Sequence, residues 1–68
     1  MPVEEAEADR GRARRFRMRA EELRVLSEQA VTAETRLLFW NLAESYDKLA
    51  DDFERRAHGE VRPQRPTG

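Results

Sequence analysis

Two stretches of this chain carry side chains at heptad spacing, and a short break separates them. In the first stretch, positions 16, 20, 23, 27 and 30 alternate steps of four and three residues. The second stretch repeats this alternation with Phe39, Leu42, Tyr46, Leu49 and Phe53. Such spacing places each set along one side of an α-helix and is typical of a coiled-coil seam. We therefore expect two amphipathic helices, over residues 12–31 and 33–57.

The residues between the two stretches favour a turn. Val31, Thr32 and Thr35 are weak helix formers, and the Thr32 hydroxyl can cap the helix that follows. A chain that folds back here aligns the stripes in antiparallel register, with the pairs Phe16–Phe53, Leu23–Tyr46 and Ala30–Phe39. The predicted fold is therefore all-α, an antiparallel two-helix hairpin. No glycine or proline marks the break, so a single kinked helix is the alternative.

The charged residues favour the same register. The first predicted helix begins with an arginine cluster, Arg10, Arg12, Arg14, Arg15, Arg17 and Arg19. The second ends with carboxylates, Asp47, Asp51, Asp52 and Glu54. Exposed ion pairs contribute at most about 1 kcal/mol each, so this match sets orientation more than stability. Between the helices we expect an apolar seam of Phe16, Leu23, Leu42, Tyr46, Leu49 and Phe53.

The two ends of the chain differ from this centre. Residues 1–11 are acidic and poor in large apolar side chains, which predicts a flexible segment or, alternatively, a frayed extension of the first helix back towards Val3. Arg55, Arg56 and His58 suit a helix C-terminus, and Gly59 is a typical left-handed terminator. Residues 59–68 contain prolines and no apolar period, which predicts a disordered tail. We therefore assign the hairpin to residues 12–58.

A lone hairpin of this size needs additional stabilisation. Chains of 68 residues bury little apolar surface, and disulfides, metals or oligomerisation usually compensate. The chain has no cysteine, which excludes disulfides, and only one histidine, which disfavours a metal site. Oligomerisation is therefore the expected means of stabilisation. Four apolar side chains fall outside both stripes: Met18, Val25, Leu37 and Trp40. We predict that they join chains into a homodimer or tetramer built as a four-helix bundle. Alternatively, Leu37 and Trp40 fold under the turn, or another protein covers the four residues.

The sequence offers no site for catalysis, a metal or a cofactor, and we expect none of the three. Ser27, Ser45 and Thr32 lack a nearby base. Adjacent carboxylates such as Glu21 and Glu22 point about 100° apart on a helix, so they do not converge. No apolar run reaches membrane-spanning length, and the N-terminus lacks the pattern of a signal peptide. We therefore expect a cytoplasmic protein without a membrane partner.

Nucleic-acid binding is the alternative function. An arginine-rich helix can neutralise phosphates, and the candidate contacts are Arg10, Arg12, Arg14, Arg15 and Arg17. Against this function stand the formal net charge of −1 and the acidic residues just upstream of the cluster. Binding to phosphates weakens steeply as salt rises, whereas apolar association persists, so the salt response separates the two functions.

Two runs of residues resemble a group of short, uncharacterised bacterial proteins that are seen especially in alphaproteobacteria. They are Met-Arg-Ala-Glu-Glu-Leu-Arg-Val-Leu-Ser-Glu-Gln-Ala at 18–30 and Leu-Ala-Glu-Ser-Tyr-Asp-Lys-Leu-Ala at 42–50. The resemblance covers about residues 17–57 and implies a bacterial source and a two-helix unit, with no functional residue to carry over. From the residues themselves we predict a small non-catalytic helical protein that acts through self-association or through another protein.

Overall fold

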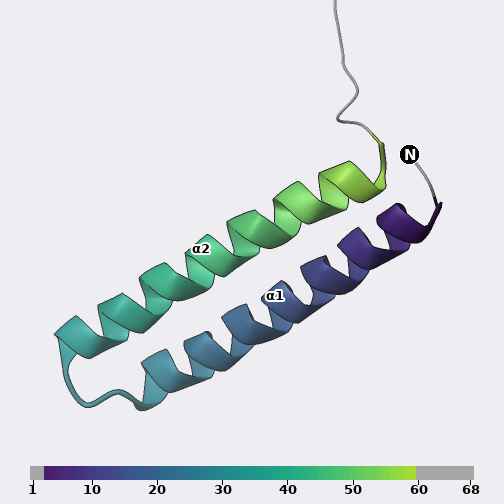
Figure 1. Cartoon of the computed structure of the whole chain (residues 1–68). Helices are drawn as coiled ribbons and strands as arrows, with labels where there is room; N and C mark the ends of the chain where they lie inside the picture. The colour runs from purple at the N-terminus through teal and green to yellow at the C-terminus, as the bar shows by residue number, and fades with distance from the viewer. Residues whose placement is uncertain (1–2, 60–68) are drawn as a thin grey trace, which may run out of the picture.

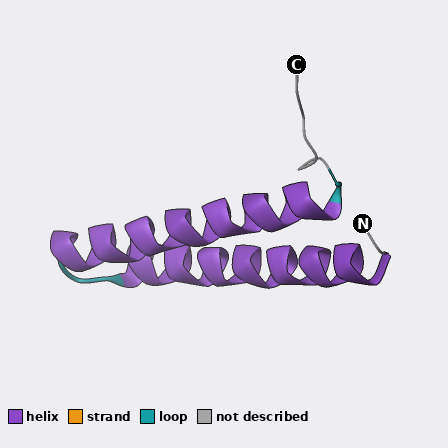
Figure 2. Cartoon of the chain, turned by 45° about the horizontal axis from the view of Figure 1, so that its top comes forward, coloured by secondary structure: helices purple, strands orange, loops and turns teal. Residues whose placement is uncertain are grey.

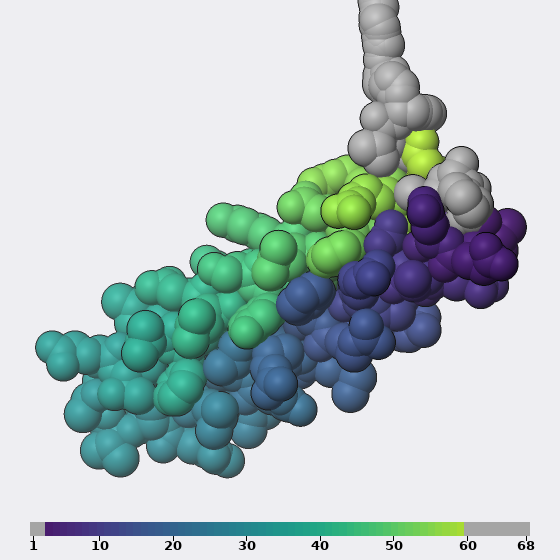
Figure 3. All heavy atoms as spheres, viewed as in Figure 1, coloured from purple at the N-terminus to yellow at the C-terminus, as the bar shows by residue number. Residues whose placement is uncertain are grey.

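A computed structural model describes residues 3–59 as an antiparallel pair of helices joined by a short turn (Figure 1). Helix α1 spans Val3–Gln29 and helix α2 spans Ala33–Ala57. Apart from the turn and the last residues after α2, this part of the chain is entirely helical (Figure 2). The two helices pack against each other along the hairpin (Figure 3). The predicted all-α hairpin is therefore confirmed, and the single kinked helix is excluded.

The turn is held by side-chain hydrogen bonds to the exposed ends of the helices. Thr32 is the N-cap of α2, with φ −105° and ψ 155°, and its hydroxyl accepts a hydrogen bond from the Thr35 backbone N–H at 3.1 Å. The Ser27 hydroxyl donates to the Arg36 carbonyl at 3.0 Å, and the Arg36 guanidinium donates to the Ala30 carbonyl at 3.2 Å. The predicted cap is confirmed, and contacts from both helices fix the turn between them.

Helix α1 begins at Val3, so the acidic segment is helical rather than flexible, which is the alternative that the sequence left open. Glu4 and Glu5 lie in the first turn, where negative charge suits the helix dipole. Ala6 and Asp9 are buried and extend the heptad spacing of the seam towards the N-terminus. The apolar stripe looked too short in the sequence because small or charged residues occupy its first positions.

Helix α2 ends where the sequence predicts. His58 takes the C-cap position, and Gly59 follows with a φ of 74°, the left-handed conformation that glycine adopts without steric penalty. The Gly59 backbone N–H donates to the Arg56 carbonyl at 3.0 Å. The predicted disordered tail, apart from Gly59, lies outside the described residues.

The register of the hairpin agrees with the prediction, but the residues that α2 contributes to the seam differ from the predicted ones. Phe16 stacks on Phe53 with ring centroids 5.6 Å apart, and Tyr46 packs against the core that contains Leu23. Leu42 and Leu49, however, are each 42% exposed. The buried positions between the aromatic side chains of α2 belong instead to Ala43, Ala50 and Ala57.

Two heptad stripes run side by side on α2, and they share the aromatic residues Phe39, Tyr46 and Phe53. One stripe adds leucines and the other adds alanines. The alanine stripe faces α1, where Ala13 and Ala20 are also buried, because small side chains on both helices permit close approach. Among the described residues no large side chain is fully buried. The hairpin therefore has a narrow seam and leaves much of its apolar surface outside.

Candidate functional site

The hairpin has two broad faces, which its interhelical contacts distinguish. At 100° per residue, Arg17 and Arg24 lie about 40–60° from the buried Ala20 in one sense of rotation, whereas Leu26 lies about 120° away in the other. Both arginines contact Asp47 on α2. The side of α1 that carries the arginines and the side of α2 that carries Asp47 therefore form one face of the hairpin. We call this the charged face.

The opposite face carries four leucines. On α2, Leu38, Leu42 and Leu49 lie on the opposite side of Ala43 from Asp47. On α1, Leu26 likewise lies on the opposite side of Ala20 from Arg17. We call this the leucine face and define it by its exposed residues, Leu26, Leu38, Leu42 and Leu49. The interhelical ion pairs thus lie on one broad side of the hairpin, and the exposed leucines lie on the other.

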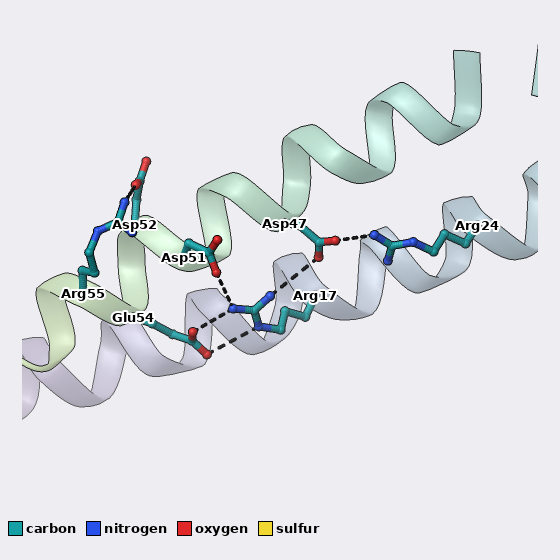
Figure 4. Close-up of polar contacts among 7 residues, drawn as sticks. All are labelled: Arg17, Arg24, Asp47, Asp51, Asp52, Glu54 and Arg55. Atoms are coloured by element: carbon teal, nitrogen blue, oxygen red, sulfur yellow. Dashed lines mark hydrogen bonds and ion pairs between the residues drawn. The ribbon is translucent and has the colours of Figure 1, made fainter. Parts of the chain in front are cut away.

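Arg17 is the centre of the charged face. Its guanidinium contacts Asp51 and Glu54, each at 2.7 Å, and Asp47 at 3.7 Å (Figure 4). Arg24 forms a further ion pair with Asp47, so one carboxylate lies between two arginines. Because these contacts join α1 to α2, they hold the helices in antiparallel register, as the sequence predicts.

The ion pairs shift the titration of their members in the expected directions. The hydrogen bond that the Arg17 guanidinium donates to Glu54, followed by the one that it donates to Asp51, raises the pKa of Arg17. The same interaction with Arg17 lowers the pKa of Glu54 below its ordinary value. The pKa of Arg24 is raised by its hydrogen bond to Asp47. These groups are largely exposed and screened by solvent, so they specify the alignment of the helices and supply little of the stability.

Near the turn, the charged face is hollowed by a groove of about 540 Å³. The groove is lined by Ser27, Glu28, Ala33, Arg36, Leu37 and Trp40. The Trp40 indole N–H donates to a Glu44 carboxylate oxygen at 3.2 Å, and the Arg24 guanidinium lies 5.4 Å from the centre of the indole ring. Trp40 is therefore partly covered by its own chain, although 44% of it remains exposed.

The structure brings together two of the four residues predicted to contact another chain. Leu37 and Trp40 share the groove at the turn. Met18 and Val25 are exposed, but they lie about 160° and 140° around α1 from Ala20, on its outer side. The four residues therefore do not form one continuous patch, and a single flat partner surface cannot cover them together.

The leucine face contains a second groove, of about 480 Å³, nearer the open end of the hairpin. It is lined by Arg12, Arg15, Phe16, Arg19, Tyr46 and Phe53. The Phe16 ring stacks on both Tyr46 and Phe53, with each pair of centroids 5.6 Å apart. Arginines lie over one of these rings, since the Arg56 and Arg12 guanidinium groups are 5.1 and 5.8 Å from the centre of Phe53. The groove thus has an aromatic floor and a basic rim.

The sequence contained a signal for the leucine face that our seam prediction misassigned. Leu42 and Leu49 have heptad spacing, and we placed them between the helices of one chain. Alanines one position further along the chain have the same spacing and fill the seam instead. A stripe of leucines beside a stripe of alanines, both at heptad spacing, indicates a helix with two different packing partners.

The arginines proposed to contact nucleic acid are not gathered on one surface. Arg17 is held by three carboxylates, and Arg12 pairs at 3.0 Å with Asp9, which is buried. Within residues 3–59, Arg10, Arg14 and Arg15 form no ion pair. Arg10 and Arg14 lie about 40° apart on one side of α1, whereas Arg15 points about 100° away from Arg14, so the three do not form one surface.

The described part of the chain contains no group of acidic or histidine side chains placed to hold a metal ion. Neither α1 nor α2 is long and apolar enough to span a membrane. Comparison with protein-family models, with curated proteins and with solved structures gives no match. The resemblance to short bacterial two-helix proteins therefore stays a prediction.

Proposed function

We propose that this protein is a small non-catalytic interaction protein that acts through its apolar surface, by self-association or by binding another protein. One observation carries the proposal. Among residues 3–59 no large side chain is fully buried, whereas ten large apolar side chains are at least 42% exposed. Apolar surface left outside a small core favours association, because burying it against a partner removes it from water.

The alanine seam explains why a partner is needed. An alanine contributes only one methyl group to the core, so a seam made of Ala13, Ala20, Ala43 and Ala50 buries little apolar area for its length. Chains of this size have little stability to spare even with a well-filled core. A second layer of helices on the hairpin would cover the exposed leucines and supply the missing burial.

The concentration dependence of thermal unfolding tests this proposal. Association stabilises the folded chain by mass action, so the midpoint measured by circular dichroism should rise as protein concentration rises. The same rise is expected in high salt, because apolar contacts are not screened. A midpoint that does not change with concentration contradicts self-association and leaves binding of a different protein as the only form of the proposal.

Nucleic-acid binding remains the second candidate, and the unpaired state of Arg10, Arg14 and Arg15 favours it within the described residues. The test is binding of a labelled DNA duplex at low and high salt. If phosphate contacts drive binding, affinity falls steeply with salt, and substitution of these three arginines by glutamine abolishes it. Under the interaction proposal, the double variant Arg10→Gln/Arg14→Gln, which leaves the leucine face unchanged, unfolds at the same midpoint as the native chain and associates as before.

A further inference from the structure

We infer that a second copy of this chain covers the leucine face, with α2 packed antiparallel on the partner's α2 around a two-fold axis between Ser45 and Tyr46. This inference rests on the proposed function and names its partner and its surface. It also relocates the contact between chains, from the residues predicted in the sequence to the opposite side of the hairpin.

The leucine face is self-complementary around that axis. Leu42 and Leu49 are equally far from the point between Ser45 and Tyr46, and so are Leu38 and Phe53. A two-fold axis there sets Leu42 against the partner's Leu49, and each such contact occurs twice, as in any isologous interface. Heptad positions that mirror one another about a central point are what a helix needs to pack antiparallel on its own copy.

The same axis matches a protruding side chain with a groove. Leu38 is the most exposed leucine of this face, at 58%. It lies level with the partner's Phe53, one of the three aromatic residues in the groove on that face. Packing of Leu38 onto these stacked rings would bury it and cover the partly exposed aromatic floor.

The arginine-rich part of α1 meets the other end of the partner's α1 under this arrangement. Leu23 lies opposite Tyr46 in the hairpin, so the axis crosses α1 beside Leu23. Arg15 then lies level with the partner's Thr32, just past the C-terminus of the partner's α1. That end carries partial negative charge, and α1 has no basic residue in its own last turn. The partner's Arg15 would add a positive charge there, next to the Arg36 guanidinium that already donates to the Ala30 carbonyl.

The other two-fold arrangement, with the axis parallel to the helices, lacks this match. It would pack α1 on the partner's α2 and set Arg19 against the partner's Leu49. In that arrangement Leu42 and Leu49 would each face the partner's α1, so their mirrored spacing on α2 would match no contact. The leucine pattern therefore favours α2 against α2.

The available area is sufficient for a stable dimer. Helix α2 has 25 residues and is about 38 Å long at 1.5 Å per residue. Two helices side by side present a face about 20 Å wide, which gives about 750 Å² for each copy. Stable interfaces bury about 800 Å² per partner. One hairpin face thus provides the area that one partner of its own size requires.

Sedimentation equilibrium of the full chain and two double variants tests the inference. Leu42→Gln/Leu49→Gln alters the leucine face, and Val25→Gln/Leu37→Gln is the matched control because it changes exposed apolar residues elsewhere. We expect a native dimer, a control that dimerises like the native chain, and at least about 100-fold weaker dimerisation of the leucine-face variant, since four half-exposed leucines leave the interface. Circular dichroism checks that each variant remains helical.

The outcomes separate the inference from the proposed function. If the control dissociates and the leucine-face variant stays dimeric, the inference is overturned while self-association stands. A monomeric native chain overturns both. A leucine-face variant that loses its helicity shifts the decision to a cross-linking experiment, which needs no destabilising substitution.

Cysteine cross-linking tests the position of the axis. The chain has no cysteine, so Ser45→Cys introduces a single thiol beside the proposed axis. The two thiols of a dimer then lie within disulfide range, and mild oxidation should yield a covalent dimer. Val25→Cys, on the outer side of α1, is the control and should remain monomeric on a denaturing gel. A Ser45→Cys protein that does not cross-link, or cross-links no faster than the control, refutes the proposed arrangement.

Discussion

Replacing Ala43 by leucine should destabilise the hairpin, because the structure leaves no room at this position. Ala43 and Ala20 are both fully inaccessible to solvent and belong to the same core cluster with Leu23. Leucine adds three carbon atoms there, which α1 and α2 can accommodate only by moving apart. Overpacking of this kind costs about 1–3 kcal/mol.

For a chain of this size, each kcal/mol corresponds to about 4–8 °C in the midpoint of thermal unfolding. We therefore expect Ala43→Leu to unfold roughly 10 °C lower than the native chain in circular dichroism at equal protein concentration. Ala8→Leu is the control, since Ala8 is exposed on α1 and leucine has nearly the helix propensity of alanine. Its stability should change by less than about 0.5 kcal/mol.

The opposite result would refute the alanine seam. If Ala43→Leu is as stable as the native chain or more stable, the position has open space around it. The leucine stripe of α2 would then face α1, with Leu42 and Leu49 in the seam, as the heptad spacing alone suggested.

Three further predictions follow from the turn, the first helix and the ion pairs. Thr32→Ala removes the cap of α2 and should cost about 1 kcal/mol in chemical denaturation, whereas Thr32→Asn should retain most of the stability. Gly11→Ala should stabilise the chain by about 0.5–1 kcal/mol, because Gly11 is inside α1 and an added Cβ would meet only Arg15, at 3.7 Å. The lowered pKa of Glu54 means that its contribution to stability is present at neutral pH and is lost as pH falls below about 4.5. Glu54→Gln should therefore be less stable than the native chain at pH 7, and the difference should shrink in acid.

Each of these predictions has a result that contradicts it. Equal stability of Thr32→Ala and Thr32→Asn would show that the hydroxyl does not cap α2. An unchanged Gly11→Ala chain would mean that the first residues are not helical in solution. For Glu54, the control is Glu22→Gln, whose ion pair with Arg19 lies within one helix. Equal acid dependence of the two variants would show that the contact of Glu54 with Arg17 does not form.

The register of the hairpin was predictable from the sequence because several independent signals agree on it. The cap at Thr32 indicates where the second helix begins, and the aromatic pair Phe16–Phe53 and the opposed charges around Arg17 each indicate the same antiparallel alignment. The structure confirms all three. Such agreement is strong evidence, since an alternative register would break every signal at once.

The start of α1 and the composition of the seam were not predictable in the same way. Asp9 is a charged residue in a buried position, where it pairs with Arg12 and lies 3.9 Å from Arg56. Nothing in the sequence marks a charge as a seam residue. On α2, alanines and leucines offered two stripes of equal period, and hydrophobicity alone favoured the leucines. Close packing of small residues decided the outcome, and this depends on the partner helix rather than on α2 itself.

The candidate surface was predictable only in part, for the same reason. Trp40 and Leu37 were recognised as apolar residues outside the predicted stripe, and the structure places them in one groove. The leucine face was hidden by the assignment of Leu42 and Leu49 to the seam. Because the alanine stripe of α2 packs against α1, these leucines lie on the surface, where a partner can cover them.

The solution mass of the full chain tests self-association most directly. We would measure it by light scattering on a sizing column, at low and at high salt. We predict a dimer, twice the chain mass of 8.0 kDa, under both conditions, because leucine contacts between two hairpins are not screened by salt. A helical species of 8.0 kDa at both salt concentrations would contradict self-association and would leave the leucine face for a different partner.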